Sequence, residues 1–251
     1  MFKISFFILL SAFCGDTLAR NGRNPYYYLQ QCSRSDPDVN DCLVNSANNL
    51  MHYIRSRGIP ELGIEKPEPI LIDEIGIALG SGPDGYRAKF RQINAFGVSN
   101  LTMTAVRSDV DTHQFQFTFY IPHISARALY ESSGVLILVK ASGGGNYWGE
   151  YEGVKAKIYL KANPIPRNGR TYLELDQLKM DFSIKDIKMG VDNLHNSNAV
   201  IEAALNLFIN TNAQDLLKEM KPDLKRKLIA IMSNFVETLF DNIPYDAWIT
   251  D

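Results

Sequence analysis

Residue types that carry enzyme chemistry occur in this chain, but not in catalytic patterns. The four histidines (His52, His113, His123 and His195) stand far apart, and none belongs to the His-Glu-x-x-His helix of a zinc protease. Residues 80–85, GSGPDG, match the glycine spacing of a dinucleotide-binding loop, but they contain proline and precede an expected strand instead of a helix. A hairpin loop is the better interpretation. We therefore expect no metal site and no cofactor. No motif in the sequence supports an enzymatic function, so we also expect that the protein is not an enzyme.

A row of phenylalanines offers a different chemistry, apolar binding. Polar and apolar residues alternate in residues 113–122, HQFQFTFYIP, so Phe115, Phe117 and Phe119 point to one side of an extended strand. Such a row faces either a packed core or a cavity, and core packing is the competing interpretation of each ring taken alone.

Further aromatic residues extend this apolar set. Tyrosine and tryptophan carry a hydrogen-bonding tip on an apolar body, which suits a ligand that is mostly hydrocarbon with a few oxygen atoms. The additional aromatic residues are Tyr147, Trp148, Tyr151, Phe182 and Phe208.

Residues 1–19 have the pattern of a secretory signal peptide. Lys3 precedes an apolar run from Ile4 to Phe13, and Ala19 ends a stretch of small residues suited to cleavage. The run is shorter than the ~20 residues needed to span a bilayer. We expect a secreted protein in haemolymph or another extracellular fluid, without stable membrane insertion.

Secretion determines how the cysteines and one asparagine are interpreted. Cys14 leaves with the signal peptide, so Cys32 and Cys42 remain and are expected to form a disulfide bond. Asn100 begins the N-glycosylation sequon Asn-Leu-Thr and is a candidate glycan site. A formal net charge of −2 without a basic run argues against a nucleic-acid partner.

Hydrophobic spacing divides the mature chain into helix, sheet and helix. Residues 39–54 and residues 214–240 repeat apolar side chains at helical spacing, whereas residues 71–191 alternate with a period of two between turn sequences such as SGGGN and PIPRNG. Residues 210–212, Asn-Thr-Asn, are expected to supply a break and a cap before the last helix, and Pro222 to start or kink part of it. The long alternating strands predict a large antiparallel sheet with one apolar face.

The C-terminal helix is apolar on most sides and therefore needs cover on most sides. No second helical layer is evident, so we expect a highly curved antiparallel sheet that wraps the helix, an α+β fold. A helix of this length runs roughly 40 Å at ~1.5 Å per residue, and side chains cannot easily fill the space around it. An elongated hydrophobic tunnel is one outcome, and a sheet that closes tightly on the helix is the other.

Several stretches, taken together and in order, resemble the insect takeout and haemolymph juvenile-hormone-binding family. The resemblance implies a long helix inside a curved sheet, a hydrophobic tunnel for one elongated ligand, and support for the Cys32–Cys42 pairing. Family ligands include juvenile hormones and other isoprenoid or fatty molecules, and members are associated with hormone transport, feeding, circadian output and chemosensory tissue. The stretches are CSRSDPDVNDCLVNSANNL, GIPELGIEKPEPILIDEI, FGVSNLTM, FYIPHI, VDNLHNSN and LFDNIPYDAWI.

We therefore predict one domain, residues 20–251, that carries a small hydrophobic ligand such as a terpenoid, isoprenoid or fatty acid. A secreted interaction or signalling protein with a filled interior is the alternative, and a lipid-modifying enzyme is a weaker one. The sequence does not identify the ligand, a receptor or the oligomeric state. The residues expected to face the interior and line the tunnel are Phe115, Phe117, Phe119, Val154, Ile158, Met180, Phe182, Met232 and Phe235.

Overall fold

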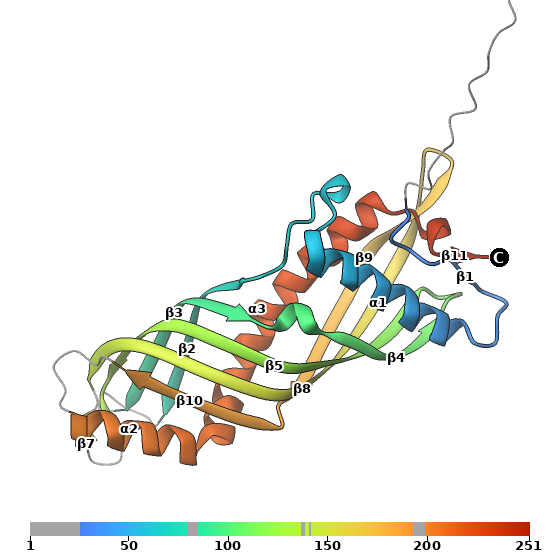
Figure 1. Ribbon diagram of the computed structural model, residues 1–251. Coiled ribbons are helices and arrows are strands. Elements are labelled where there is room, and N and C mark those ends of the chain that lie inside the picture. The colour runs from blue at the N-terminus through green and yellow to red at the C-terminus, as the bar shows by residue number, and fades with distance from the viewer. Residues whose placement is uncertain (1–25, 80–84, 137–138, 141, 193–198) are drawn as a thin grey trace, which may run out of the picture.

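A computed structural model describes residues 26–79, 85–136, 139–140, 142–192 and 199–251. The expected signal peptide, all but the last residue of the GSGPDG loop, and residues 193–198 of the VDNLHNSN stretch lie outside this part. A curved antiparallel sheet and a long helix, α3 (Ala213–Asn242), form the body of the molecule (Figure 1). The expected fold class, α+β with the C-terminal helix on the concave side of a curled sheet, is confirmed.

Two very long strands form the middle of the sheet. β5 (Gln114–Ser133) pairs with β8 (Gly143–Arg167) along most of its length. On the other edge of β5, β4 (Thr102–Asp109) pairs with its first half and β3 (Tyr86–Phe96) with its second half. On the other edge of β8, β10 (Asp186–Asp192) pairs with its first half and β9 (Arg170–Ser183) with its second half. β2 (Ile70–Leu79) adds a strand beside β3.

Both long strands change face at one level of the sheet. In β5 the buried side chains are odd-numbered up to Ile121 and even-numbered from Ala126 onward. In β8 the change occurs at Gly153, which has a φ of +63° and lies opposite the gap between Ile121 and His123 in the pairing. A Cβ at Gly153 would come within 2.9 Å of the Lys185 Cβ, so both the backbone conformation and the space favour glycine. The sheet is thereby bent into two halves.

The C-terminal helix α3 is continuous through Pro222 and lies along the concave side of both halves (Figure 1). It starts and ends within two residues of the expected limits. Asn212 occupies the N-cap position, but its side chain donates to the Phe208 carbonyl and makes no cap hydrogen bond. Beyond Met220 its apolar side chains are half-buried.

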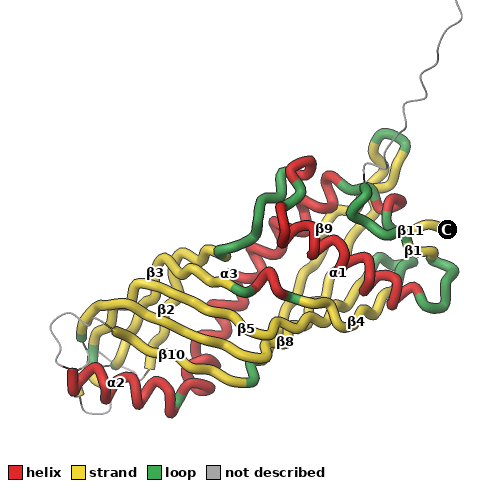
Figure 2. Tube along the Cα trace, in the orientation of Figure 1, coloured by secondary structure: helices red, strands yellow, loops and turns green. Residues whose placement is uncertain are grey.

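Two shorter helices cover opposite edges of the sheet, contrary to the expectation of a single helical layer. α1 (Val39–Arg57) was expected and lies against β4, while α2 (Ala199–Thr211) was not expected and lies against β10 (Figure 2). The unanticipated α2 is apolar on both faces, so its spacing alone gives no clear helical stripe.

Asparagine side chains attach each of these helices to its edge strand. Asn48 accepts from the Met103 backbone N–H at 2.8 Å and donates to the same residue's carbonyl at 3.0 Å. Asn206 makes the equivalent two bonds to Val191, both at 2.8 Å. Each amide thus replaces the neighbouring strand that an edge residue lacks.

Two sequences that were expected to be turns belong largely to strands, although Asn168 and Gly169 of PIPRNG form the expected turn between β8 and β9. Gly143–Gly145 begin β8 and pair with residues 130–132, and Pro164 and Pro166 lie in β8 opposite β9. Beyond Lys161 the described strands pair with β8 on the β9 side alone, so the prolines occupy a strand with a free edge among these residues, where a missing N–H is tolerated.

The two ends of the described chain meet beside α1. β1 (Cys32–Ser33) pairs in parallel with β11 (Ile249–Thr250), and the expected disulfide joins Cys32 to Cys42 in the first turn of α1. No helix of the described residues is long and apolar enough to cross a bilayer.

Candidate ligand-binding site

Two apolar cavities lie between the sheet and α3. The first, called here the central cavity, has a volume of about 250 Å³ and lies between the inner faces of β2, β3, β5, β8, β9 and β10 and the middle of α3. Its walls include Ile72, Phe90 and Val154 from the sheet and Leu224 and Leu228 from the helix. The half-buried side chains of α3 therefore face an internal space.

The second space, called here the end cavity, has a volume of about 200 Å³. It lies among α1, α3, the first half of β5 and the C-terminal segment, with Leu43 and Leu50 of α1 opposite Val236 of α3. Trp248 closes it beside the disulfide, since the Cys32 N–H donates to the Trp248 carbonyl at 2.9 Å.

The two cavities share three lining residues, Phe119, Ile158 and Met232. These residues come from β5, β8 and α3, and they are called here the neck. A methionine at this place is adaptable, because its unbranched side chain has three rotatable bonds. The two cavities therefore adjoin at the neck, beside a side chain that can change its shape.

All nine residues expected to line a tunnel lie on these cavity walls. Three of them, Val154, Met180 and Phe182, line the central cavity alone. Another three, Phe115, Phe117 and Phe235, line the end cavity alone. The remaining three, Phe119, Ile158 and Met232, are the neck. Phe115 is only 2% exposed and stacks on Phe117 with ring centroids 5.9 Å apart, so it also belongs to the packed core.

Sequence reasoning missed the parts of the lining that come from other elements. Ile72 and Ile75 of β2 and Phe90 of β3 line the central cavity, and Leu43 and Leu50 of α1 line the end cavity. The alternation of β2 and the helical stripe of α1 were visible, but neither pattern indicates which cavity its apolar face meets.

Polar side chains are few on these walls, and among the described lining residues none is charged. In the end cavity the Ser46 hydroxyl donates to the Gln30 carbonyl at 2.8 Å and accepts from the Gln30 N–H at 3.2 Å. In the central cavity the hydroxyls of Tyr147 and Tyr151 are hydrogen-bonded to each other. Desolvation by burial raises the pKa of both phenols, so both are neutral at physiological pH.

A third, small space of about 20 Å³ separates the central cavity from α2. Tyr86 and Tyr130 lie on its wall, and their hydroxyls are 2.5 Å apart. Burial raises the pKa of both side chains. The α2 end of the interior thus has three tyrosines, Tyr86, Tyr130 and Tyr147, among its apolar lining residues, whereas the described lining of the end cavity contains no tyrosine.

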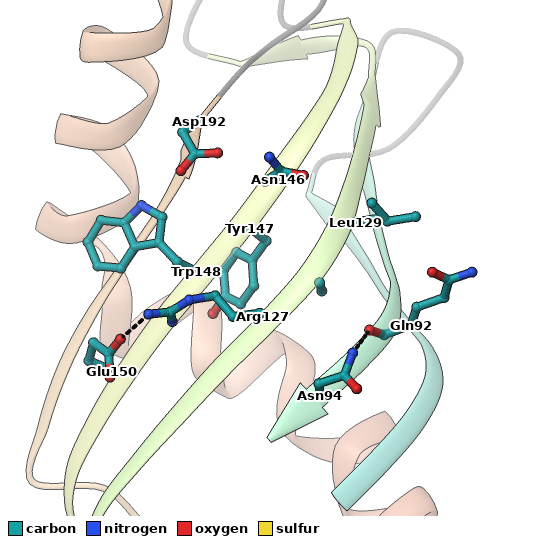
Figure 3. A pocket seen from close by; sticks show the side chains of 10 residues that line it. Gln92, Asn94, Arg127, Leu129, Asn146, Tyr147, Trp148, Glu150 and Asp192 are labelled. Atoms are coloured by element: carbon teal, nitrogen blue, oxygen red, sulfur yellow. Dashed lines mark hydrogen bonds and ion pairs between the residues drawn. The ribbon is translucent and has the colours of Figure 1, made fainter. Parts of the chain in front are cut away.

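A larger depression of about 630 Å³ lies on the outer face of the sheet, but it is polar and open (Figure 3). Arg127 donates to Glu150 at 2.8 Å and also to the Ala126 carbonyl at 2.8 Å, while His123 contacts the other Glu150 oxygen at 2.9 Å. Partial burial by itself would raise the pKa of Glu150. The hydrogen bond from Arg127 outweighs that effect and holds this pKa below its usual value. These charges are paired with one another, so the groove offers no evident ligand site.

The candidate glycan site is accessible in the structure. Asn100 ends the short 3-10 helix η2 (Val98–Asn100) and is exposed, and its side-chain oxygen accepts a hydrogen bond from Arg55 at 3.3 Å. Since both side chains are exposed, this bond is no barrier to modification.

Comparison with known proteins agrees with this architecture. The solved structure of Takeout 1 from Epiphyas postvittana superposes with a TM-score of 0.75 over 89% of this chain and all of that chain, at 16% identity. The chain is 25% identical over 227 residues to the circadian clock-controlled protein daywake of Drosophila melanogaster, covering 87% of this chain and 85% of that protein. It is 20% identical over 222 residues to a "Putative beta-carotene-binding protein" of Schistocerca gregaria, covering 87% of each.

The family comparison spans nearly the whole sequence. The family model described as haemolymph juvenile hormone binding protein matches residues 7–250. This match covers both cavities, the neck and the disulfide. The chain belongs to the haemolymph juvenile hormone binding protein family.

Proposed function

We propose that this protein is a secreted, non-enzymatic carrier of one elongated, uncharged hydrophobic molecule. The observation that carries the proposal is the pair of adjoining apolar cavities whose described walls hold no charged side chain. The family and its relatives, one of which is named for beta-carotene binding, support the general class of ligand.

The size of the cavities favours a long ligand over a compact one. Pockets for drug-sized ligands usually measure about 300–1,000 Å³. The central cavity at about 250 Å³ and the end cavity at about 200 Å³ each fall below that range, whereas the two joined through the neck reach it. A ligand with about 15 buried carbons gains roughly 12 kcal/mol at about 0.8 kcal/mol per carbon. Association costs of about 4–15 kcal/mol leave room for a useful affinity.

The lack of charge in the lining favours terpenoids and other neutral molecules over fatty acids. A buried carboxylate without a cationic partner costs several kcal/mol of desolvation. The described interior is also not filled by the protein's own side chains, which speaks against a pure interaction protein. Its polar side-chain groups are the phenols, the Trp248 indole N–H and a serine hydroxyl that is already bonded within the protein, which gives a lipid-modifying enzyme no acid–base pair to use.

The neck provides the test. Met232→Trp places a large ring between the cavities, and losing contact with about two methylenes costs about tenfold in affinity. We expect at least that loss for an isoprenoid alcohol of about 20 carbons and little change for one of about 10 carbons, which fits a single cavity. Asn234→Trp, at an exposed position two residues further along α3, is the matched control.

Binding is measured by displacement of a fluorescent apolar probe from each variant. Equal affinity of Met232→Trp and Asn234→Trp for the long ligand would refute the two-cavity proposal. Secretion is tested separately by expressing the full chain in insect cells and determining the N-terminus of the protein in the medium, which is expected to begin at Arg20.

A further inference from the structure

We infer that Tyr147 and Tyr151 form a hydrogen-bonding anchor for an uncharged oxygen at one end of the ligand, such as that of an ester or ketone. This inference rests on the proposed carrier function and adds the chemical class and the orientation of the guest. The two phenols are the polar side chains that the described wall of the central cavity presents.

The local sequence is arranged so that the two hydroxyls meet. Tyr147 and Tyr151 are four residues apart on β8, a distance of about 13 Å along a strand. Their hydroxyls can therefore meet only if both side chains lie along the strand, over the residue between them. That residue is Gly149, and a Cβ there would be 2.7 Å from each hydroxyl oxygen. Gly149 thus provides the room in which the phenol pair sits.

One of the two hydroxyl protons of the pair has only a weak acceptor among the described residues. Two hydroxyls carry two protons, and one proton forms the bond between Tyr147 and Tyr151. The described partner for the other is the Met189 sulfur, 3.4 Å from the Tyr147 hydroxyl, and a thioether is a weak acceptor. A ligand oxygen is a better acceptor, and in an apolar cavity this exchange is favourable.

The surroundings select an uncharged oxygen. Burial keeps both phenols neutral, so they donate without bringing a charge into the cavity. No described lining residue of the central cavity is charged. The Lys221 ammonium lies 5.1 Å from the Phe182 ring centroid, but it pairs with Asp181 at 3.0 Å, so a carboxylate in the cavity gains no unpaired cation from it. Esters, ketones, ethers and alcohols satisfy the phenols at no such cost.

The position of the pair also sets the direction of binding. Tyr147 lines both the central cavity and the small space beside α2, and it packs on Phe90 with ring centroids 4.7 Å apart. The neck opens toward the end cavity, whose lining is almost wholly apolar. The oxygen-bearing end of the guest therefore lies toward α2, and its hydrocarbon tail extends through the neck toward Trp248.

The experiment compares methyl palmitate, heptadecane and palmitate as competitors of a fluorescent apolar probe. The double variant Tyr147→Phe/Tyr151→Phe removes both hydroxyls and keeps the ring volumes. We expect the ester to lose about 3- to 10-fold in affinity, the value of one hydrogen bond, and the alkane to be unchanged. The single variants each leave one phenol and are expected to lose less. Palmitate is expected to bind the unchanged protein at least about tenfold more weakly than its methyl ester at neutral pH.

Tyr86→Phe is the matched control, since it removes a buried phenol that lines the neighbouring small space and not the central cavity. It is expected to leave the ratio of ester to alkane affinity unchanged. The anchor is refuted if the double variant weakens ester and alkane equally, or weakens neither. If the unchanged protein binds none of the three molecules, the carrier proposal itself fails and the anchor fails with it.

Discussion

The asparagines that attach α1 and α2 to the sheet edges should be worth more stability than their partial exposure implies. Asn48→Ala removes the bonds of 2.8 Å and 3.0 Å to the Met103 backbone. Met103 is only 6% exposed, so its N–H and carbonyl lose their partners in a place that water reaches poorly. At about 1 kcal/mol for each bond, with a further penalty for unsatisfied groups, the loss is about 2–3 kcal/mol.

Helix propensity works in the opposite direction and must be measured separately. Alanine in place of asparagine inside a helix gains about 0.5 kcal/mol. Asn45 lies on the same helix and is exposed, so Asn45→Ala reports that gain alone. The difference between the two variants isolates the contact with the edge strand.

The assay is denaturant unfolding of the two variants and the unchanged protein, followed by circular dichroism. A difference of about 2–3 kcal/mol corresponds to roughly 4–12 °C in Tm for a chain of this size. Asn206→Ala, which removes two bonds of 2.8 Å to Val191, should show a similar loss at the opposite edge. A difference below about 0.5 kcal/mol between Asn48→Ala and Asn45→Ala would refute the reasoning, because it would mean that water replaces the amide at no cost.

Three further predictions concern covalent and titratable groups. Cys32→Ser/Cys42→Ser opens a link across a sequence separation of 10 residues and should lower the free energy of unfolding by about 3 kcal/mol in a denaturant titration. The raised pKa values of Tyr86, Tyr130, Tyr147 and Tyr151 give a stability that is complete below pH ~10 and is lost as pH rises further, because only the unfolded chain then releases these protons. Tyr147→Phe/Tyr151→Phe should therefore flatten the alkaline fall in stability by about 2.7 kcal/mol per pH unit, and an unchanged slope would contradict the burial of these phenols. Protein collected from the medium of insect cells should lose mass on treatment with an N-glycosidase, and Asn100→Gln should abolish that loss.

The sequence predicted those parts of the fold that follow from simple periodicity. The α1 and α3 stripes, the alternating strands and the Cys32–Cys42 pair all appear where expected. It did not predict α2, whose apolar residues fall on both faces, or the strand prolines Pro164 and Pro166, whose tolerance depends on a free edge.

The candidate site was predictable only within one regular element at a time. The row from Phe115 to Phe119 faces inward as its alternation indicates. The change of face between Ile121 and Ala126 cannot be read from alternation, because it depends on Gly153 in the partner strand. That change is what brings Tyr147 and Tyr151 inward, since the parity of Val154 and Ile158 would have turned them to solvent.

The internal cavities connect the proposed ligand binding with folding. Cavities in protein cores cost about 24 cal/mol per Å³, which gives about 6 kcal/mol for a central cavity of about 250 Å³. A typical domain has a net stability of about 5–15 kcal/mol, so this cost is a large part of the total. A guest that fills the space restores contacts to α3, whose side chains beyond Met220 are otherwise half-buried. The proposed carrier function therefore predicts that a bound guest raises the free energy of unfolding by adding contacts between α3 and the sheet.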